Sequence, residues 1–282
     1  MKMNICVLPL AMIGALTISQ PVIAEVVEWG EFKVIIETNA TDGDVGFHAL
    51  ADGDAWRWAG MEDPDGNMIW STRAQGGLMQ QGLTESFFES AEPLCEPDPD
   101  EPDEDVADLA EFISRFPEGE YIARANTNEG DRLLGSAELT YNMPAAPDIS
   151  MTEDTEQYIH EVVIEWAPGT DLGDKCHDQS LIDDGTVADP ADVEVVGWEV
   201  VVEPDDEDAA EPFRVYKVQV PPEQTRVLVP EAYLWMLFDE GFTEFKFEVG
   251  AIEESGNQTF SEGSFEVNHE FSFLHDESSH RK

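Results

Sequence analysis

The stretch TDGDVGFHALADGDAWRWAGME (residues 41–62) contains two Asp-Gly-Asp triplets with seven residues between them. The residues between and after the triplets are mostly apolar or aromatic, which is typical of β-strands, whereas Gly and Asp are typical of turns. The pattern predicts two short strands, 46–51 and 55–62, framed by turns. Trp56 and Trp58, two positions apart, are predicted to share one strand face and to belong to the core.

Short strands of the same kind recur through residues 25–143, for example at 32–38 and 67–74. The segment EPDPDEPDED (96–105) holds seven acidic residues and three prolines, so it is predicted to be a solvated loop. The next segment, 106–116, has apolar residues at i, i+3, i+4 and i+7, which predicts a helix. We therefore expect a β-sandwich-like first domain with one short packed helix.

The second half of the chain contains five β-rich segments in a recognisable order: VVIEWAP (162–168), VVGWEVVVE (195–203), FRVYKVQVPP (213–222), TRVLVP (225–230) and GFTEFKFEVGAIEESGNQTFSEGSFEV (241–267). In order, spacing and core residues this region resembles a fibronectin type III domain, covering about 145–269. The fold class expected for the chain is therefore all-β, with two β-sandwich domains in tandem. The second domain spans 144–270 and is followed by a polar tail, 271–282.

The resemblance implies positions for several core residues. Trp166 would be the inter-sheet tryptophan of the second strand, and Trp198 the aromatic residue of the third strand. Val249 and Ala251 would be buried, alternating positions of the sixth strand.

The chain also departs from the pattern of that family. Phe245 occupies the position of the usual corner tyrosine, so the hydroxyl hydrogen bond that closes the corner is missing. An acidic insertion, 169–192, lengthens the loop between the second and third strands. The connection 230–241 is also long and is predicted to hold a helical turn.

The N-terminal residues 1–24 have the pattern of a secretory signal peptide. Lys2 gives a basic start, an apolar run extends from Ile5 to Leu16, and a small-x-small sequence ends at Ala24. The apolar run is too short to span a bilayer, and no other stretch approaches the roughly 20 apolar residues of a membrane helix. We expect an exported protein, periplasmic or extracellular, without a membrane span.

The charge of the chain is strongly unbalanced, with 62 acidic and 14 basic residues and a net charge of −48. Such a surface repels nucleic acid and anionic lipid, so neither is an expected partner. The self-repulsion is costly in dilute buffer, but at an ionic strength approaching seawater the Debye length falls to only a few Å. The composition therefore favours a marine or salt-tolerant bacterial source.

Two of the three cysteines, Cys95 and Cys176, lie outside the predicted signal peptide. An even pair in an oxidising compartment favours a disulfide between them. Two free thiols are the alternative, since no Cys-x-x-Cys pair or Cys/His cluster indicates metal or redox chemistry.

Six aspartates of the first domain are predicted to lie near strand ends: Asp42, Asp44, Asp52, Asp54, Asp63 and Asp65. Ca²⁺ requires six to eight oxygen ligands, often from neighbouring loops, so calcium would bind if these turns met at one end of the sandwich. No segment satisfies the EF-hand pattern. Structural turns are the favoured interpretation, and calcium is the only cofactor the sequence suggests.

Glycan binding through exposed tryptophans is a further hypothesis, with Trp56, Trp58, Trp70 and Trp235 as candidates. The alternative is that strand tryptophans are buried. Asn39-Ala40-Thr41 and Asn257-Gln258-Thr259 match the glycosylation sequon.

No signature of catalysis is present, since the sequence lacks a Gly-x-Ser-x-Gly elbow and HEVVIEW (160–166) lacks the second histidine of a zinc protease helix. We therefore predict no catalytic residues and a non-catalytic exported binding module with a protein or glycan partner. The alternative is a secreted hydrolase or a calcium-dependent glycan-binding accessory protein.

Overall fold

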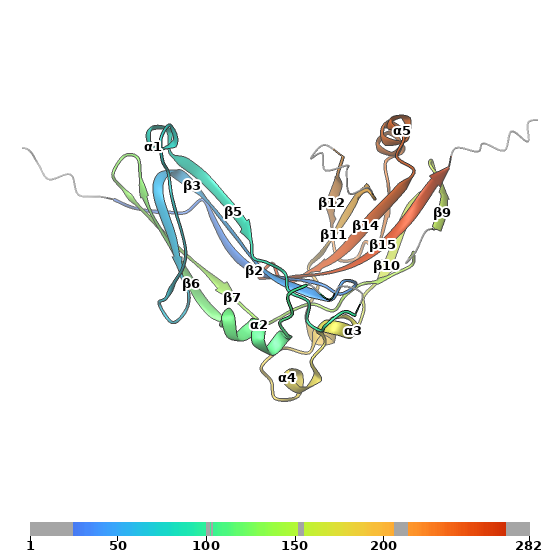
Figure 1. Ribbon diagram of the computed structural model, residues 1–282, viewed down its shortest axis with the longest axis horizontal. Coiled ribbons are helices and arrows are strands. Elements are labelled where there is room, and N and C mark those ends of the chain that lie inside the picture. Colours follow the sequence, from blue (N-terminus) through green and yellow to red (C-terminus); the bar gives the residue numbers. More distant parts are fainter. Residues whose placement is uncertain (1–24, 100–101, 103, 152–154, 206–213, 269–282) are drawn as a thin grey trace, which may run out of the picture.

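The computed structural model describes residues 25–99, 102, 104–151, 155–205 and 214–268. The predicted signal peptide (1–24) and polar tail (271–282) lie outside the described residues, as do three positions of the acidic loop 96–105. The molecule has the shape of a V, whose two arms meet at a base formed by the helices α2, α3 and α4 (Figure 1). The all-β fold predicted from the sequence is confirmed. No helix among the described residues is long and apolar enough to cross a membrane.

The second arm is a sandwich of two layers whose strand pairs are antiparallel, except that β9 runs parallel to β15. One layer has the order β13-β10-β8, and the other has the order β15-β14-β11-β12, with β9 beside β15. The bounds are β8 (Asp148–Ile149), β9 (Thr155–Tyr158), β10 (Val163–Ala167), β11 (Gly197–Pro204), β12 (Tyr216–Val220), β13 (Arg226–Leu228), β14 (Glu244–Ile252) and β15 (Gln258–Asn268).

The core of this arm lies between the two layers, where the sequence placed it. Trp166 on β10 and Trp198 on β11 pack edge to face, with ring centroids 5.9 Å apart. Val249 and Ala251 on β14 are fully buried in the same core. The expected helical turn is helix α5 (Glu231–Glu240), which ends at Gly241 in the left-handed conformation. The resemblance therefore placed Trp166, Trp198, Val249 and Ala251 correctly in the core.

The first arm is built around one very long strand. Its elements are β1 (Val26–Glu28), β2 (Glu31–Asn39), β3 (Asp44–Glu62), β4 (Met68–Arg73), α1 (Leu78–Gln81), β5 (Leu83–Glu89), α2 (Leu109–Arg115), β6 (Gly119–Thr127) and β7 (Arg132–Leu139). The first half of β3 pairs with β2 and β5, and its second half pairs with β4 and β6. Strand β3 therefore belongs to two half-sheets, which enclose the core of this arm.

The prediction of two strands at 46–51 and 55–62 was wrong, because β3 runs through the second Asp-Gly-Asp triplet without a turn. Around this triplet the pairing register shifts instead, once between Asp52 and Trp56 and once between Trp56 and Trp58, and a third shift lies between Met61 and Glu62 in the pairing with β4. Each irregularity changes which alternate residues point inward. The buried apolar side chains of β3 are accordingly Val45, Phe47, Ala49, Ala51, Trp56, Ala59 and Met61.

The helix predicted over 106–116 is shorter in the structure. Val106 forms an isolated bridge with Leu94, and the Asp108 side chain caps the helix by accepting from the Glu111 amide at 2.7 Å. Helix α2 therefore begins at Leu109 and packs its buried side onto the core of the first arm. The sequence analysis did not predict α1 or β5.

The two arms share a sheet, so they are not joined by a linker alone. Within the described residues, twelve strands form one sheet, and the seam between the arms is a parallel pairing of β2 with β15 over Glu37–Asn39 and Gln258–Phe260. Asn257, which precedes β15, is fully buried at this seam. Its Oδ1 accepts from the Ile36 amide at 2.8 Å, and its Nδ2 donates to the carbonyls of Thr140 and Asn142 at 2.9 and 3.2 Å.

The acidic insertion of the second domain completes the core of the first. It holds the helices α3 (Gly173–Cys176) and α4 (Gln179–Asp183) and the 3₁₀ turn η1 (Pro190–Asp192), at the base of the V (Figure 1). Leu172, Cys176 and Val187 from this segment are buried in the core of the first arm. The segment 142–148, where the two domains were predicted to join, is likewise part of the base, since Met143 is buried in that core.

Cys95 and Cys176 form a disulfide across the base, with Cα atoms 5.1 Å apart and 81 positions apart in sequence. Lys175, next to Cys176, donates to the Asp42 carbonyl at 2.9 Å and to the Asp98 carboxylate at 3.0 Å. The insertion is therefore held to the first arm by a covalent bond, an ion pair and apolar packing.

We predict that Asn257→Ala lowers the free energy of unfolding by about 2–4 kcal/mol, because it leaves the buried Ile36 amide and Thr140 carbonyl without their partner. Urea titration of the full chain measures the change. Asn126→Ala, at an exposed position of β6, is the control and should change stability by less than about 0.5 kcal/mol. An equal effect of the two substitutions would contradict the role assigned to Asn257.

We predict that replacing Cys95 and Cys176 together by alanine lowers the free energy of unfolding by about 2–5 kcal/mol, because a long loop of the unfolded chain is no longer closed. The radius of gyration from small-angle X-ray scattering should not change, since the β2–β15 seam remains. A clear increase in that radius would mean that the disulfide, and not the seam, holds the arms in place.

Candidate functional site

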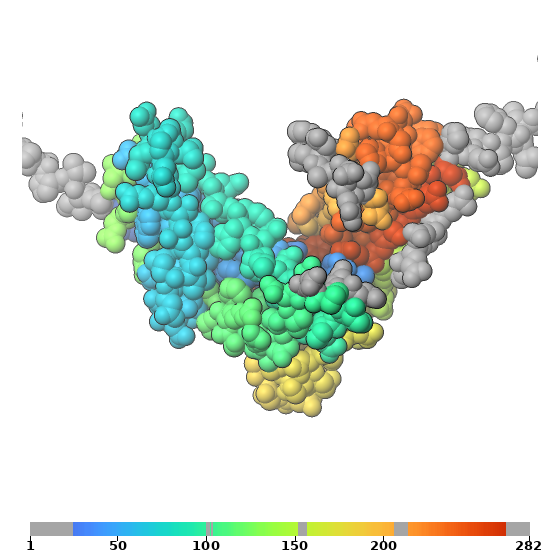
Figure 2. Space-filling model, viewed as in Figure 1, coloured from blue at the N-terminus to red at the C-terminus, as the bar shows by residue number. Residues whose placement is uncertain are grey.

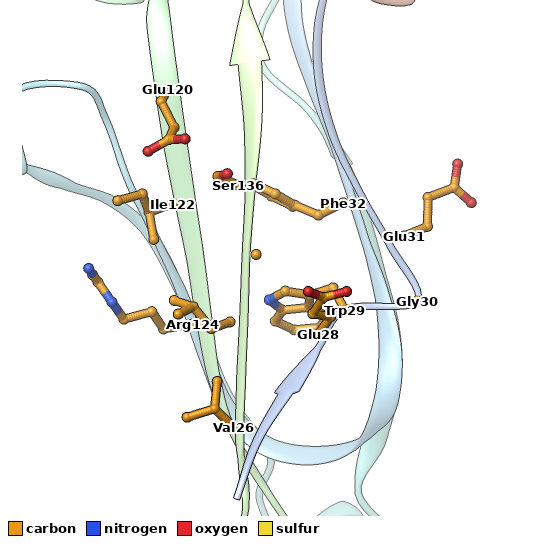
Figure 3. Close-up of a pocket in the computed structure, with 12 residues that line it drawn as sticks. Val26, Glu28, Trp29, Gly30, Glu31, Phe32, Glu120, Ile122, Arg124 and Ser136 are labelled. Atoms are coloured by element: carbon orange, nitrogen blue, oxygen red, sulfur yellow. The ribbon is translucent and has the colours of Figure 1, made fainter.

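A hollow of about 610 Å³ lies on the first arm where β1 parts from β7 (Figure 3). Strand β1 runs parallel to β7, and the chain then turns away at Gly30 into β2. Trp29 and Phe32 lie on one side of β7 and Ile122 and Arg124 on the other (Figure 3). The Trp29 hollow, as we name it, is lined by Val26, Glu28, Trp29, Gly30, Glu31, Phe32, Glu120, Ile122, Arg124, Leu134, Gly135 and Ser136.

The floor of the Trp29 hollow is set by one tryptophan and one glycine. Trp29 is only 8% exposed and donates from Nε1 to the Ala123 carbonyl at 3.1 Å. A Cβ at Gly135 would lie 2.8 Å from Cδ1 of the Trp29 ring, so only glycine lets the ring lie against β7. Val26 and Leu134 are exposed beside this floor. The result is an apolar depression whose base is rigid.

The rim of the Trp29 hollow is acidic. Glu31 pairs with Lys33, and Arg124 pairs with Glu62, so these charges are compensated locally. Glu28 and Glu120 have no ion-pair partner among the described residues. The rim therefore carries uncompensated negative charge around an apolar base, which is complementary to a ligand that combines cationic and apolar groups.

One edge of β7 beside the hollow has no paired strand, among those described, along part of its length, although β2 lies close to it. Strand β1 pairs only with Arg132–Leu134 of β7. From Gly135 to Leu139 this edge has no strand partner in the part of the chain that is described. Unpaired strand edges offer backbone donors and acceptors to an added strand.

A second polar region covers the face of the shared sheet that points away from the cores. Along β2, β3, β11, β14 and β15 the residues on this face alternate with the buried ones. We name it the acidic face; its carboxylates are Glu37, Asp44, Glu89, Glu92, Glu199, Glu203, Glu248 and Glu262. It crosses the seam from one arm to the other.

Several carboxylates of the acidic face are hard to ionise. Burial raises the pKa of Glu248 to about 7, and the charges of Glu262, Glu203 and Glu37 add to this effect while Lys246 opposes it. Burial also raises the pKa of Asp44 to about 7, aided by Glu92, Asp42 and Glu262. Negative charge is thus crowded here without enough cations to balance it.

His48 is the one buried histidine among the described residues, 4% exposed, and carboxylates face both of its ring nitrogens. Its Nε2 lies 2.9 Å from Glu92 Oε1, and its Nδ1 lies 3.7 Å from Glu37 Oε2. Burial lowers the pKa of His48, but the hydrogen bond to Glu92 and the charges of Glu37, Glu92 and Glu89 outweigh it, so the net pKa is raised. We name Glu37, His48 and Glu92 the His48 cluster.

The six candidate aspartates are not brought together. Asp44 and Asp54 lie ten positions apart on β3, roughly 30 Å in an extended strand, so the two triplets do not meet at one end of the arm. Asp63 accepts from the Asn67 amide at 2.8 Å and so stabilises the β3–β4 turn that holds Asp65. Asp42 and Asp44 approach Glu92 and Glu262, which the sequence did not associate with them. Calcium binding stays a prediction.

The four candidate tryptophans differ in exposure. Trp56 is 0% exposed and contacts Trp29 edge to face, with ring centroids 6.3 Å apart, so it belongs to the core. Trp58, Trp70 and Trp235 are half-buried. The expectation that Trp56 and Trp58 share a face was wrong, because the register shift between them turns Trp58 outward. No flat row of exposed tryptophans is formed by these four residues.

The sequence analysis missed Trp29, His48, Glu37 and Glu92. Their sequence signals are weak: Trp29 stands before a glycine, and His48 is one polar residue in an apolar strand. The sequon at Asn257 is not available in the folded protein, because its side chain is fully buried and bonded to three backbone groups.

No protein-family model matches the sequence, and no curated protein matches it. Similar solved structures include the FN1-FN3 domains of chicken CNTN1, a 1.5-MDa bacterial ice-binding adhesin, and trypsin-activated alpha-2-macroglobulin from Escherichia coli. Their sequence identities are 12%, 11% and 14%, with TM-scores of 0.30, 0.25 and 0.26. The matches cover 87%, 88% and 84% of this chain and 68%, 66% and 15% of the other chains. Such values support no inference about ligand or activity.

We predict that Glu248→Gln stabilises the protein at pH 8 and leaves its stability unchanged at pH 4. The folded-state pKa of about 7 lies above the ordinary value of 4.5, so the contribution of Glu248 to stability is present below about pH 4.5 and is lost as the pH rises through 7. The gain at pH 8 should be about 1–3 kcal/mol, measured by urea titration at both pH values.

The control for this substitution is Glu266→Gln, an exposed position on the neighbouring strand β15. It makes the same change in charge and should have little effect at either pH. A loss of stability at pH 8 on replacing Glu248 would show that its charge is compensated in the folded protein.

Proposed function

We propose that this protein is a non-catalytic, exported binding module that captures an extended polypeptide segment in the Trp29 hollow. The partner carries an apolar side chain for the base of the hollow and Lys or Arg for its rim. The observation that carries the proposal is the coincidence of an apolar depression, uncompensated Glu28 and Glu120, and an edge of β7 that is unpaired among the described strands, at one place.

Each of these features supports a different part of recognition. The unpaired edge of β7 at Gly135 and Ser136, which line the hollow, supplies backbone hydrogen bonds that do not depend on the peptide sequence. Val26 and Leu134 supply apolar contact, and the acidic rim selects cationic neighbours and speeds encounter. The hydrogen bond from Trp29 to Ala123 fixes the base of the hollow, so the protein loses little conformational entropy when a ligand binds.

We further infer that the second domain is a fibronectin type III-like unit acting as a support. The layer order β13-β10-β8 facing β15-β14-β11-β12, with Trp166 between the layers, favours this assignment. Its insertion closes the core of the first arm, and its strand β15 extends the sheet of that arm. The support therefore fixes the arm that carries the Trp29 hollow.

We predict that Leu134→Arg lowers the affinity for such peptides by at least about tenfold, since it removes an apolar contact and places a cation in the acidic rim. A phage-displayed library of linear peptides, selected on the immobilised full chain, supplies the ligands. Peptides with Lys or Arg beside an apolar residue should be enriched. Fluorescence titration with a synthetic copy of an enriched peptide measures the loss.

Leu228→Arg is the matched control, because it makes the same change at an exposed leucine of the other arm, on β13. It should leave the affinity unchanged. Because Leu134 is 41% exposed and Leu228 61% exposed, neither substitution disturbs a core. Equal affinities of the two variants, or failure to enrich any cationic peptide, would overturn the proposal.

A further inference from the structure

The His48 cluster brings together three side chains from separate segments of the first arm. Glu37 lies on β2, His48 on β3, and Glu92 follows β5. One ligand atom from each lies within 4.8 Å of the other two. His48 is buried, whereas the side chains of Glu37 and Glu92 are 30% and 39% exposed, so the cluster is anchored in the sheet and open to solvent.

Because Gly46 has no side chain, the cluster can occupy the space beside its backbone. Gly46 lies on β3 two positions before His48, with its backbone outside the left-handed region, so its conformation does not require glycine. A Cβ at this position would lie 2.6 Å from Glu92 Oε1 and 3.0 Å from His48 Nε2. Glycine in the interior of a strand weakens it and marks a close approach from outside. Here the approaching groups are a carboxylate and an imidazole.

We propose that Glu37, His48 and Glu92 bind a divalent transition-metal ion, with Zn²⁺ as the best match. One imidazole nitrogen and two carboxylate oxygens are the usual zinc ligands, at about 2.0–2.2 Å from the ion. Glu92 lies beside Nε2 and Glu37 beside Nδ1, so the partly exposed Glu37 side chain has to turn toward an ion bound at Nε2. The three protein ligands then leave a fourth position for water. The imidazole disfavours Ca²⁺ and Mg²⁺, which prefer oxygen ligands alone.

The surroundings of the cluster also favour a cation. Glu89 lies directly opposite His48 across the β3–β5 pairing, and Asp44 lies on the same face of β3. A bound divalent ion would offset the repulsion among these carboxylates. It would also link β2, beside the β2–β15 seam, to the segment that leads from Glu92 to the disulfide at Cys95. Metal binding should therefore stabilise the base of the V.

The test is calorimetric titration of the dialysed full chain with zinc chloride in 0.5 M sodium chloride, where weak binding to dispersed carboxylates is screened. We expect one saturable site and a raised melting temperature. His48→Gln and Glu92→Gln should each weaken zinc binding at least about tenfold. Glu266→Gln, which removes an exposed carboxylate on β15, should not change it.

Gly46→Ala provides a variant that alters no ligand. The added Cβ meets Oε1 and Cγ of Glu92 and lies 3.0 Å from His48 Nε2. Because the Glu92 side chain is 39% exposed and can move aside, the protein should fold while the carboxylate is displaced and zinc binding weakens. In a titration with calcium chloride under the same conditions, His48→Gln should leave any calcium affinity unchanged. The proposal is overturned if no saturable zinc site is found, or if His48→Gln and Gly46→Ala both leave zinc affinity unchanged.

Discussion

The buried amide of Asn257 is the contact on which the arrangement of the two arms depends. It accepts from β2 of the first arm and donates to the segment that leaves β7, while its own backbone directly precedes β15 of the second arm. A net charge of −48 acts to separate the arms. Fully satisfied hydrogen bonds in a buried site are costly to break one at a time, because each leaves an unpaired polar group. Asn257 thus fixes the register in which β15 can join β2.

Because that register is fixed, the two arms behave as one body. The notch between them, visible in the space-filling view (Figure 2), has walls of continuous sheet meeting at the shared base. The residues that close the first core, Leu172 and Val187, belong by sequence to the second domain. The arms are therefore neither independent nor joined by a free linker.

Burial that follows from the local pattern of a strand was predicted from the sequence. Contacts that arise from pairing between distant strands were not. In β11 and β14 inward and outward residues largely alternate, and the family resemblance placed Trp198 and Val249 correctly in the core. In β3 register shifts interrupt the alternation, and Trp58 was placed on the wrong face. The β2–β15 pairing and the meeting of Glu37, His48 and Glu92 join residues far apart in sequence, and no local pattern encodes them.

The acidic residues of this chain fall into two classes that differ in physical cause. Exposed carboxylates repel one another through solvent, and a salty medium removes most of that cost by screening. The carboxylates of Glu248 and Glu37 are partly buried, and the cost of removing them from water is little changed by salt. Screening by a salty medium would therefore relieve the repulsion of the first class alone. The second class lowers stability at neutral pH, and only a cationic group placed close to these side chains can offset that cost.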